Sequence, residues 1–129
     1  MSNAHQPLNR AYLADIFEAG GEVLVQDVVG TFLEDAPRRM RALNEAVTAG
    51  DWQGVSQAAH GIVSGASMLG LTDVAESAQQ CEHTAGQGIR PAADVLQRLH
   101  AAVAAASGLL RAETARLIAA GESGQGEPA

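Results

Sequence analysis

The sequence is poor in aromatic residues, cysteine and long apolar runs. Aromatic side chains make up 3% of its 129 residues, which is little for a sheet, because strands favour aromatic and β-branched residues. The single cysteine, Cys81, cannot form an internal disulfide, so we expect a reduced core thiol in a cytoplasmic protein. No apolar run reaches the roughly 20 residues that a transmembrane helix needs, and no signal-peptide pattern opens the chain.

The sequence also has too few positive charges for some classes of partner. Its formal net charge is −7 at pH 7, so it offers little counter-charge to a phosphate backbone or an anionic lipid surface. We therefore expect neither a nucleic-acid partner nor a membrane partner. What the chain has instead is alanine and other small apolar residues, and 47% of it is hydrophobic. This composition and length predict one domain of closely packed helices.

Glycine and proline divide the chain into helical segments. Gly50-Asp51 is typical of a helix stop followed by an N-cap, and Thr72 or Asp73 is expected to cap the segment after Gly70. Pro37 is expected to kink a helix, and we count the pieces on its two sides as one element. The expected segments are about Leu8–Ala19, Glu22–Glu34 with its continuation to Ala49, Trp52–Leu69, Thr72–Gly86 and Pro91–Ala119.

Short loops between long amphipathic helices predict an all-α fold. We expect an antiparallel up-down four-helix bundle with a short extra N-terminal helix. The helical domain should cover residues 8–119. Residues 1–7 are expected to be a tag remnant or a disordered N-terminus. Residues 120–129 lack periodicity and are rich in Gly, Glu and Ser, so we expect a disordered tail or linker there.

His60 lies on the polar face of an amphipathic helix and has small neighbours. With roughly 100° between successive residues, the polar residues of this segment gather on the side of His60, opposite the apolar ones. Gly61, Ser64 and Ser67 add little bulk beside the imidazole. A solvated helix face usually carries long charged side chains. This face therefore favours close approach of a large partner.

Three features of the sequence resemble the histidine-containing phosphotransfer (HPt) domain family. They are the Asp-Ala-Pro after Phe32-Leu33-Glu34, the Gly-Asp before the histidine helix, and Ala59-His60 followed by Leu69-Gly70. The resemblance covers about Leu8 to Leu117. It implies a bundle in which a histidine carries a phosphoryl group. The implied partners are a sensor or hybrid histidine kinase and the receiver domain of a response regulator.

The resemblance also implies roles for single residues. His60 matches the phosphoacceptor, and Glu82 matches a glutamate that hydrogen bonds to the imidazole in the phosphotransfer domains of chemotaxis kinases. Such a bond fixes the tautomer and raises the basicity of the ring. Gln79, one turn before Glu82, would face the same way. Val63 departs from the pattern, because the family has a lysine there that would offset the phosphoryl charge. The residues expected to bind partners are Gln57, Gly61, Val63, Ser64, Ser67, Arg38 and Arg39.

Two functions stay open at this point. The resemblance implies a phosphoryl carrier without kinase activity of its own, whose receiver partner supplies Mg²⁺. The valine at position 63 keeps a non-phosphorylated helical interaction module as the alternative. No cofactor or bound metal is expected, because His5, His83 and His100 lack the spacing of zinc ligands. We interpret these three histidines as structural or surface residues.

Overall fold

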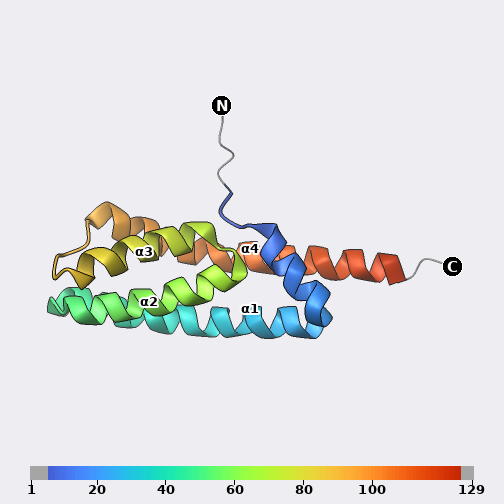
Figure 1. The fold of residues 1–129 in the computed structure, drawn as a ribbon, viewed down its shortest axis with the longest axis horizontal. Helices are drawn as coiled ribbons and strands as arrows, with labels where there is room; N and C mark the ends of the chain where they lie inside the picture. Colours follow the sequence, from blue (N-terminus) through green and yellow to red (C-terminus); the bar gives the residue numbers. More distant parts are fainter. Residues whose placement is uncertain (1–5, 126–129) are drawn as a thin grey trace, which may run out of the picture.

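The computed structural model describes residues 6–125, with side chains up to Gly121. This part of the chain forms four helices: α1 (Arg10–Ala49), α2 (Trp52–Leu69), α3 (Thr72–Gly86) and α4 (Ala93–Gln125). α1 contacts α2 and α4, and α3 contacts the same two helices. Figure 1 shows successive helices running back and forth side by side. The predicted all-α four-helix fold is therefore confirmed.

Local caps set the boundaries of the helix that carries His60. Gly50 ends α1 and Gly70 ends α2, with φ values of 69° and 73°. Glycine adopts this left-handed conformation without steric cost. The Asp51 side chain accepts a hydrogen bond from the backbone nitrogen of Gly54 at 3.0 Å, which satisfies a free N–H in the first turn of α2. The predicted stop and cap before α2 are confirmed.

The start of α3 differs from the prediction. Leu71 is the N-cap residue and makes no side-chain capping bond, so neither Thr72 nor Asp73 caps the helix. The Thr72 hydroxyl instead donates to the backbone oxygen of Gln6 at 2.6 Å. The Thr72 backbone nitrogen donates to the oxygen of Pro7 at 3.1 Å. Thr72 thus holds the start of the chain rather than the start of its own helix.

The prediction of a separate N-terminal helix is wrong. The residues from Arg10 belong to α1, which is continuous apart from a bend at Gly21 (φ 71°, ψ −161°). That backbone conformation is essentially restricted to glycine, so the chain changes direction there without ending the helical element. In Figure 1 the dark-blue start of α1 crosses the end of the bundle toward α4. We call residues 10–20 the N-terminal arm.

Two further boundaries also need correction. Pro37 lies inside α1, and Figure 1 shows this helix running straight after its bend at Gly21, so the predicted kink at the proline is wrong. The proline is exposed, while Ala36 and Met40 on either side of it pack into the core. This packing holds the helix straight. At the other end of the chain, α4 begins at Ala93 and runs through Gln125 rather than ending at Ala119. Residues 1–5 and 126–129, which belong to the expected disordered ends, lie outside the described residues.

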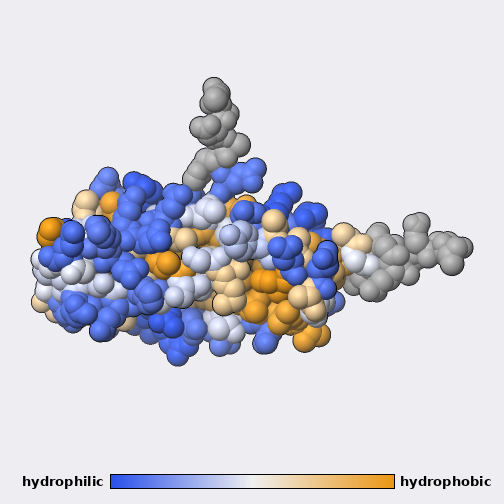
Figure 2. Space-filling view, viewed as in Figure 1, coloured by the Kyte–Doolittle hydropathy of each residue, from blue (hydrophilic) through white to orange (hydrophobic). Residues whose placement is uncertain are grey.

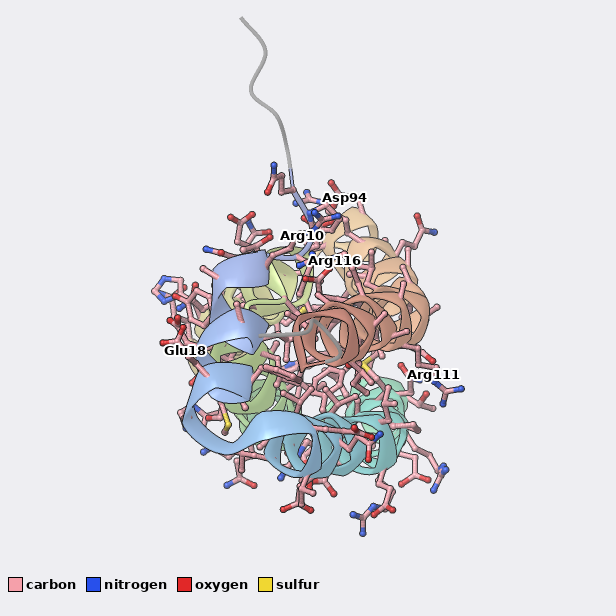
Figure 3. The ribbon with its side chains drawn as sticks, turned by 90° about the vertical axis from the view of Figure 1, so that its right-hand side faces the viewer. Arg10, Glu18, Asp94, Arg111 and Arg116 are labelled. Atoms are coloured by element: carbon pink, nitrogen blue, oxygen red, sulfur yellow. The ribbon has the colours of Figure 1, made fainter. Side chains whose placement is uncertain are left out.

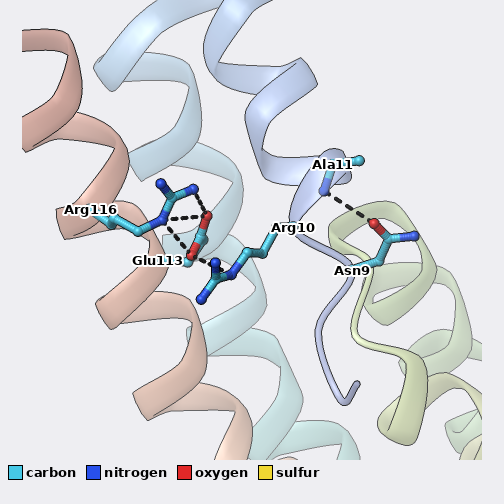
Figure 4. Close-up of polar contacts among 5 residues, drawn as sticks. All are labelled: Asn9, Arg10, Ala11, Glu113 and Arg116. Atoms are coloured by element: carbon cyan, nitrogen blue, oxygen red, sulfur yellow. Dashed lines mark hydrogen bonds and ion pairs between the residues drawn. The ribbon is translucent and has the colours of Figure 1, made fainter. Parts of the chain in front are cut away.

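A buried carboxylate fastens the N-terminal arm to α4. The Glu113 side chain is 4% exposed, and Arg10 Nε lies 3.3 Å from its Oε1. Arg116 Nε donates to the same oxygen at 3.1 Å, as Figure 4 shows. In the end-on view of Figure 3, Arg10 and Arg116 lie close together, whereas Glu18 and Arg111 point outward. The hydrogen bond from Arg116 holds the pKa of Glu113 below its usual value, with further help from the charges of both arginines and against the effect of burial.

The hydrophobic core runs along the inside of the bundle. Leucines from the arm, from α1, α2 and α4, and from the N-cap of α3 are fully buried, including Leu13, Leu43, Leu69, Leu110 and Leu71. Figure 2 shows a largely hydrophilic surface over the α2–α3 end of the molecule and an apolar patch near the bend of α1, where Val23 is 79% exposed. Within residues 6–125 no helix has the length and apolar character needed to cross a membrane.

Candidate functional site

His60 projects from the middle of α2 into solvent and is held at one ring nitrogen. Its side chain is 69% exposed, and its Nδ1 lies 2.8 Å from Oε2 of Glu82 on α3. The structure thus brings together the two residues that the sequence places on successive helices. Because a carboxylate only accepts hydrogen bonds, this contact favours the tautomer with the proton on Nδ1. Nε2 is then the nitrogen with a free lone pair.

A second contact fixes α3 against α2 beside the site. The Ser56 hydroxyl, one turn before His60, donates to the backbone oxygen of Glu82 at 3.2 Å. The bond holds the α3 backbone at the residue whose carboxylate faces the imidazole. The sequence places Ser56 on the polar face of its helix but does not predict this bond, because the acceptor lies on another helix. On α2 itself, the Ser64 hydroxyl donates to the His60 backbone oxygen at 3.2 Å.

The helix surface beside His60 is covered by an arginine from α1. A Cβ atom placed on Gly61 would lie 2.7 Å from Cζ of Arg39 and would also overlap its Nη1. The Arg39 guanidinium therefore rests directly over the Gly61 backbone. Glycine is needed here for close approach rather than for a special φ angle. α3 thus contributes a carboxylate to His60 itself, and α1 contributes a cation over the next residue of α2.

The other expected site residues differ in how close they come to His60. Gln57 and Ser67 are exposed on α2. Val63 is half-buried and packs against the core, on the side of α2 away from Arg39 by helical geometry. Arg38 is ion-paired with Asp35 on its own helix. Gln79 is exposed on α3, and no hydrogen bond joins it to His60 in the part of the chain that the structure describes.

An apolar groove begins next to Arg39 and follows the seam between α1 and α2. Its volume is about 270 Å³. Phe32 from α1 and Met68 from α2 contribute to its lining, and Gly65 permits close packing because a Cβ there would lie 3.2 Å from the Phe32 ring. From the sequence Phe32 is one of several apolar residues expected to lie mostly in the core, with a few of them left exposed for a partner. The groove arises only when α1 and α2 pack together.

Other potentially reactive side chains lie away from this site. The Cys81 thiol is buried, and burial raises its pKa to about 11, so it stays protonated near neutral pH. His100 Nε2 lies 2.9 Å from Oδ1 of Asn44, and His83 is exposed on α3. His5 is outside the described residues. Among residues 6–125, no group of three or more His, Cys, Asp or Glu side chains is arranged to hold a metal ion.

The structure thus presents an exposed histidine on a four-helix bundle, with its Nδ1 held by a carboxylate. Residues 27–119 match the family model of the Hpt domain. The chain therefore belongs to the Hpt domain family, as its sequence features suggest, and this is a family of phosphotransfer carriers. Hpt domains relay phosphoryl groups between kinases and receivers.

A solved structure gives the same answer for the fold. The chain is similar to histidine-containing phosphotransfer protein B (HptB) from Pseudomonas aeruginosa PAO1, with 25% sequence identity and a TM-score of 0.78. The match covers 88% of this chain and 98% of that chain. No curated protein matches the sequence significantly.

Proposed function

We propose that this protein is a phosphorelay intermediate that carries a phosphoryl group on Nε2 of His60. In this proposal a sensor or hybrid histidine kinase supplies the group, directly or through its receiver domain. The protein then passes it to the aspartate of a response-regulator receiver. It has no kinase activity of its own. The observation that carries the proposal is the 2.8 Å contact between His60 Nδ1 and Glu82 Oε2 beneath an exposed imidazole.

The chemistry of the transfer needs few residues from this chain. The Nε2 lone pair attacks the phosphorus of an aspartyl phosphate, and the bond between phosphorus and the aspartyl oxygen breaks. The aspartate leaves with the bonding electron pair, while the proton on Nδ1 stays hydrogen-bonded to Glu82. The receiver contributes the aspartate and its Mg²⁺. Positioning of the reacting groups and stabilisation of the phosphoryl charge lower the barrier to transfer. Transfer to the next receiver is the reverse step: an oxygen of its aspartate attacks phosphorus, and the bond between phosphorus and Nε2 breaks.

The surface around His60 fits this role. Ser64 and Ser67 leave room for the active-site end of a receiver to reach Nε2, while Arg39 covers Gly61 on the α1 side. The groove between α1 and α2 gives that partner an apolar surface beside the imidazole, which is the usual composition of an interface centre. We therefore assign Gln57, Ser64 and Ser67 to the docking surface, together with the rim of the groove, where Arg39 covers Gly61.

The test is transfer from a hybrid histidine kinase that has been autophosphorylated with radiolabelled ATP. The wild-type protein is expected to acquire an acid-labile, alkali-stable label, while His60→Gln acquires none. Because His60 is exposed, His60→Gln should keep the wild-type circular dichroism spectrum and melting temperature. An unrelated phosphotransfer domain labelled in parallel shows that the donor is competent.

Two results would contradict the proposal. If His60→Gln is labelled as fully as the wild-type protein, the acceptor lies elsewhere, and His83 and His100 become the candidates. If the wild-type protein stays unlabelled while the reference domain is labelled, the chain is better described as a helical interaction module that kept the bundle and lost the chemistry. The valine at position 63 is the observation that keeps this second function in view.

A further inference from the structure

We propose that Arg39 binds the phosphoryl group on His60 and supplies, from α1, the positive charge that Val63 cannot supply from α2. This inference rests on the proposed function, because it concerns the phosphorylated state of His60. It adds a phosphoryl-binding residue from a different helix to the site.

The position of Arg39 carries the inference. Its guanidinium lies over Gly61, the residue that follows His60, and any side chain at position 61 would overlap it. The cation therefore lies over the residue of α2 that is next to the phosphoacceptor in sequence. Arg39 also lines the groove together with Ser64, which lies one turn beyond His60 on the same face of α2. A phosphoryl group on Nε2 would extend from that face.

The charge of Arg39 is available, whereas those of most other cations in the chain are engaged. The chain contains no lysine, so arginines provide all its permanent side-chain positive charge. Arg38 is paired with Asp35, Arg10 and Arg116 with Glu113, and Arg90 lies over the Trp52 ring. Within residues 6–125 the guanidinium of Arg39 has no carboxylate partner.

A guanidinium suits this task for chemical reasons. Its planar fork donates two parallel N–H bonds to phosphate oxygens, and it stays charged at any relevant pH. Arg39 approaches from the α1 side, while Glu82 occupies the α3 side and holds Nδ1. The two groups therefore do not compete. The carboxylate fixes the ring, and the cation stabilises the oxygens of the phosphoryl group.

The lifetime of phosphorylated His60 tests the inference without a cognate partner. The full chain is phosphorylated with phosphoramidate, the donor is removed, and loss of the phosphoryl group is followed by phosphorus NMR and intact-mass spectrometry at neutral pH. Arg39→Gln should shorten the lifetime by roughly two- to fivefold, the range expected for one exposed charge pair. The difference should shrink in molar salt, because salt screens an exposed ion pair. A purely structural role of Arg39 would not give this salt dependence.

Three variants sharpen the test. Arg41→Gln removes an exposed charge two residues away, on another side of α1, and should leave the lifetime unchanged. Gly61→Ala should act like Arg39→Gln, because the new methyl group displaces the guanidinium, and it should fold normally because the displaced atoms end a flexible side chain. The double change Arg39→Gln with Val63→Lys should restore the lifetime, since it returns a cation to the α2 side of the imidazole.

The outcomes separate this inference from the proposed function. If His60 is phosphorylated and Arg39→Gln has the wild-type lifetime at low salt, the inference is wrong and the proposed function stands. If phosphoramidate labels a reference phosphotransfer domain but not wild-type His60, the proposed function fails, and this inference fails with it. Circular dichroism of each variant confirms that a changed lifetime does not come from unfolding.

Discussion

At the scale of single residues, the two nitrogens of the His60 ring face different surroundings. Nδ1 meets the Glu82 carboxylate at 2.8 Å, while the exposed side of the ring faces solvent. A neutral imidazole attacks only through its unprotonated nitrogen, so in the proposed transfer a fixed proton on Nδ1 would direct the reaction to Nε2. The carboxylate also stabilises the positive charge that the ring gains when phosphorus bonds to Nε2.

Substitutions of Glu82 should separate hydrogen bonding from charge. Glu82→Ala removes both and should slow phosphorylation of His60 by roughly 10–100-fold, as is typical when the group that orients a reactive imidazole is lost. Glu82→Gln keeps an oxygen that can accept a hydrogen bond from Nδ1–H, so the phosphorylation rate should fall less. The rate is measured with phosphoramidate at saturating concentration. Glu76→Ala, an exposed glutamate on the same helix, is the matched control.

An effect of Glu76→Ala equal to that of Glu82→Ala would contradict the orienting role, because Glu76 would then matter through net charge alone. Wild-type rates for Glu82→Ala would have the same consequence. In either case the contact between His60 and Glu82 would be a surface ion pair of little value, as most such pairs are.

At the scale of elements, the path of α1 determines what surrounds the site. After Gly21 the helix runs straight along α2, which carries Arg39 to Gly61 and builds the groove. Before Gly21 the arm crosses to α4, and the Asn9 backbone nitrogen donates to the oxygen of Gly70 at 2.7 Å. The bend therefore lets one helix line the site and cover the α2–α3 connection at the same time.

Alanine substitutions at two glycines of α1 should have opposite effects on stability. Gly21→Ala forces a side chain into φ 71°, ψ −161° and should lower the free energy of unfolding by about 1–3 kcal/mol. Gly30→Ala is the matched control within the same helix, because a Cβ there meets nothing within 4 Å. It should raise the free energy of unfolding by about 0.5–1 kcal/mol. Urea unfolding followed by circular dichroism measures both.

A stabilised Gly21→Ala variant would mean that α1 can run straight through position 21 and that the bend is not required. Phosphorylation of His60 should be unchanged in Gly30→Ala. That residue faces away from the groove, which is lined by Val28, Thr31 and Phe32 on the same helix.

At the scale of the whole molecule, a buried carboxylate connects the first and last helical segments. Glu113 on α4 pairs with Arg116 one turn away and with Arg10 on the N-terminal arm, as Figure 4 shows. Burying a single charge is costly unless it is paired and hydrogen-bonded, so Glu113 needs both arginines. This pairing holds the arm against the bundle far from His60.

Glu113→Gln should destabilise the protein in a pH-dependent way. The folded-state pKa of Glu113 is lowered, chiefly by the hydrogen bond from Arg116. The ionised carboxylate therefore contributes fully to stability above the usual pKa of a glutamate. This contribution is lost as the pH falls from that value through the lowered pKa of the folded state. At pH 7 the substitution should cost about 1–2 kcal/mol of unfolding free energy. The gap from wild type should close as the solution is acidified.

Chemical unfolding at several pH values measures this dependence. Glu45→Gln removes an exposed carboxylate from α1 and should change stability little across the same range. A Glu113→Gln penalty that stayed constant from neutral to acidic pH would show that the loss comes from packing, with no contribution from the ion pair. Labelling of His60 should be normal in Glu113→Gln at neutral pH.

The sequence alone determined the all-α four-helix fold and singled out His60 as the candidate phosphoacceptor. Apolar periodicity, Gly50 and Gly70 gave the bounds of α2, because these signals act within a few residues of each other. The resemblance to the Hpt domain family pointed to His60 and to Glu82. Two local signals predicted the path of α1 wrongly. Gly20-Gly21 suggested the end of a helix, where the structure has a bend within α1, and Pro37 suggested a kink. Packing of Ala36 and Met40 outweighed the missing hydrogen bond of proline.

Only the tertiary structure decided which side chains from different helices meet. The sequence could not show whether any of Arg38, Arg39 and Arg41 reaches the histidine, because that depends on how α1 rotates and slides against α2. The structure places Arg39 over Gly61, pairs Arg38 with Asp35, and ties Ser56 to the backbone of Glu82. Helix periodicity fixes which residues share one face, but contacts between helices come from the packing of whole surfaces, which no short stretch of sequence contains.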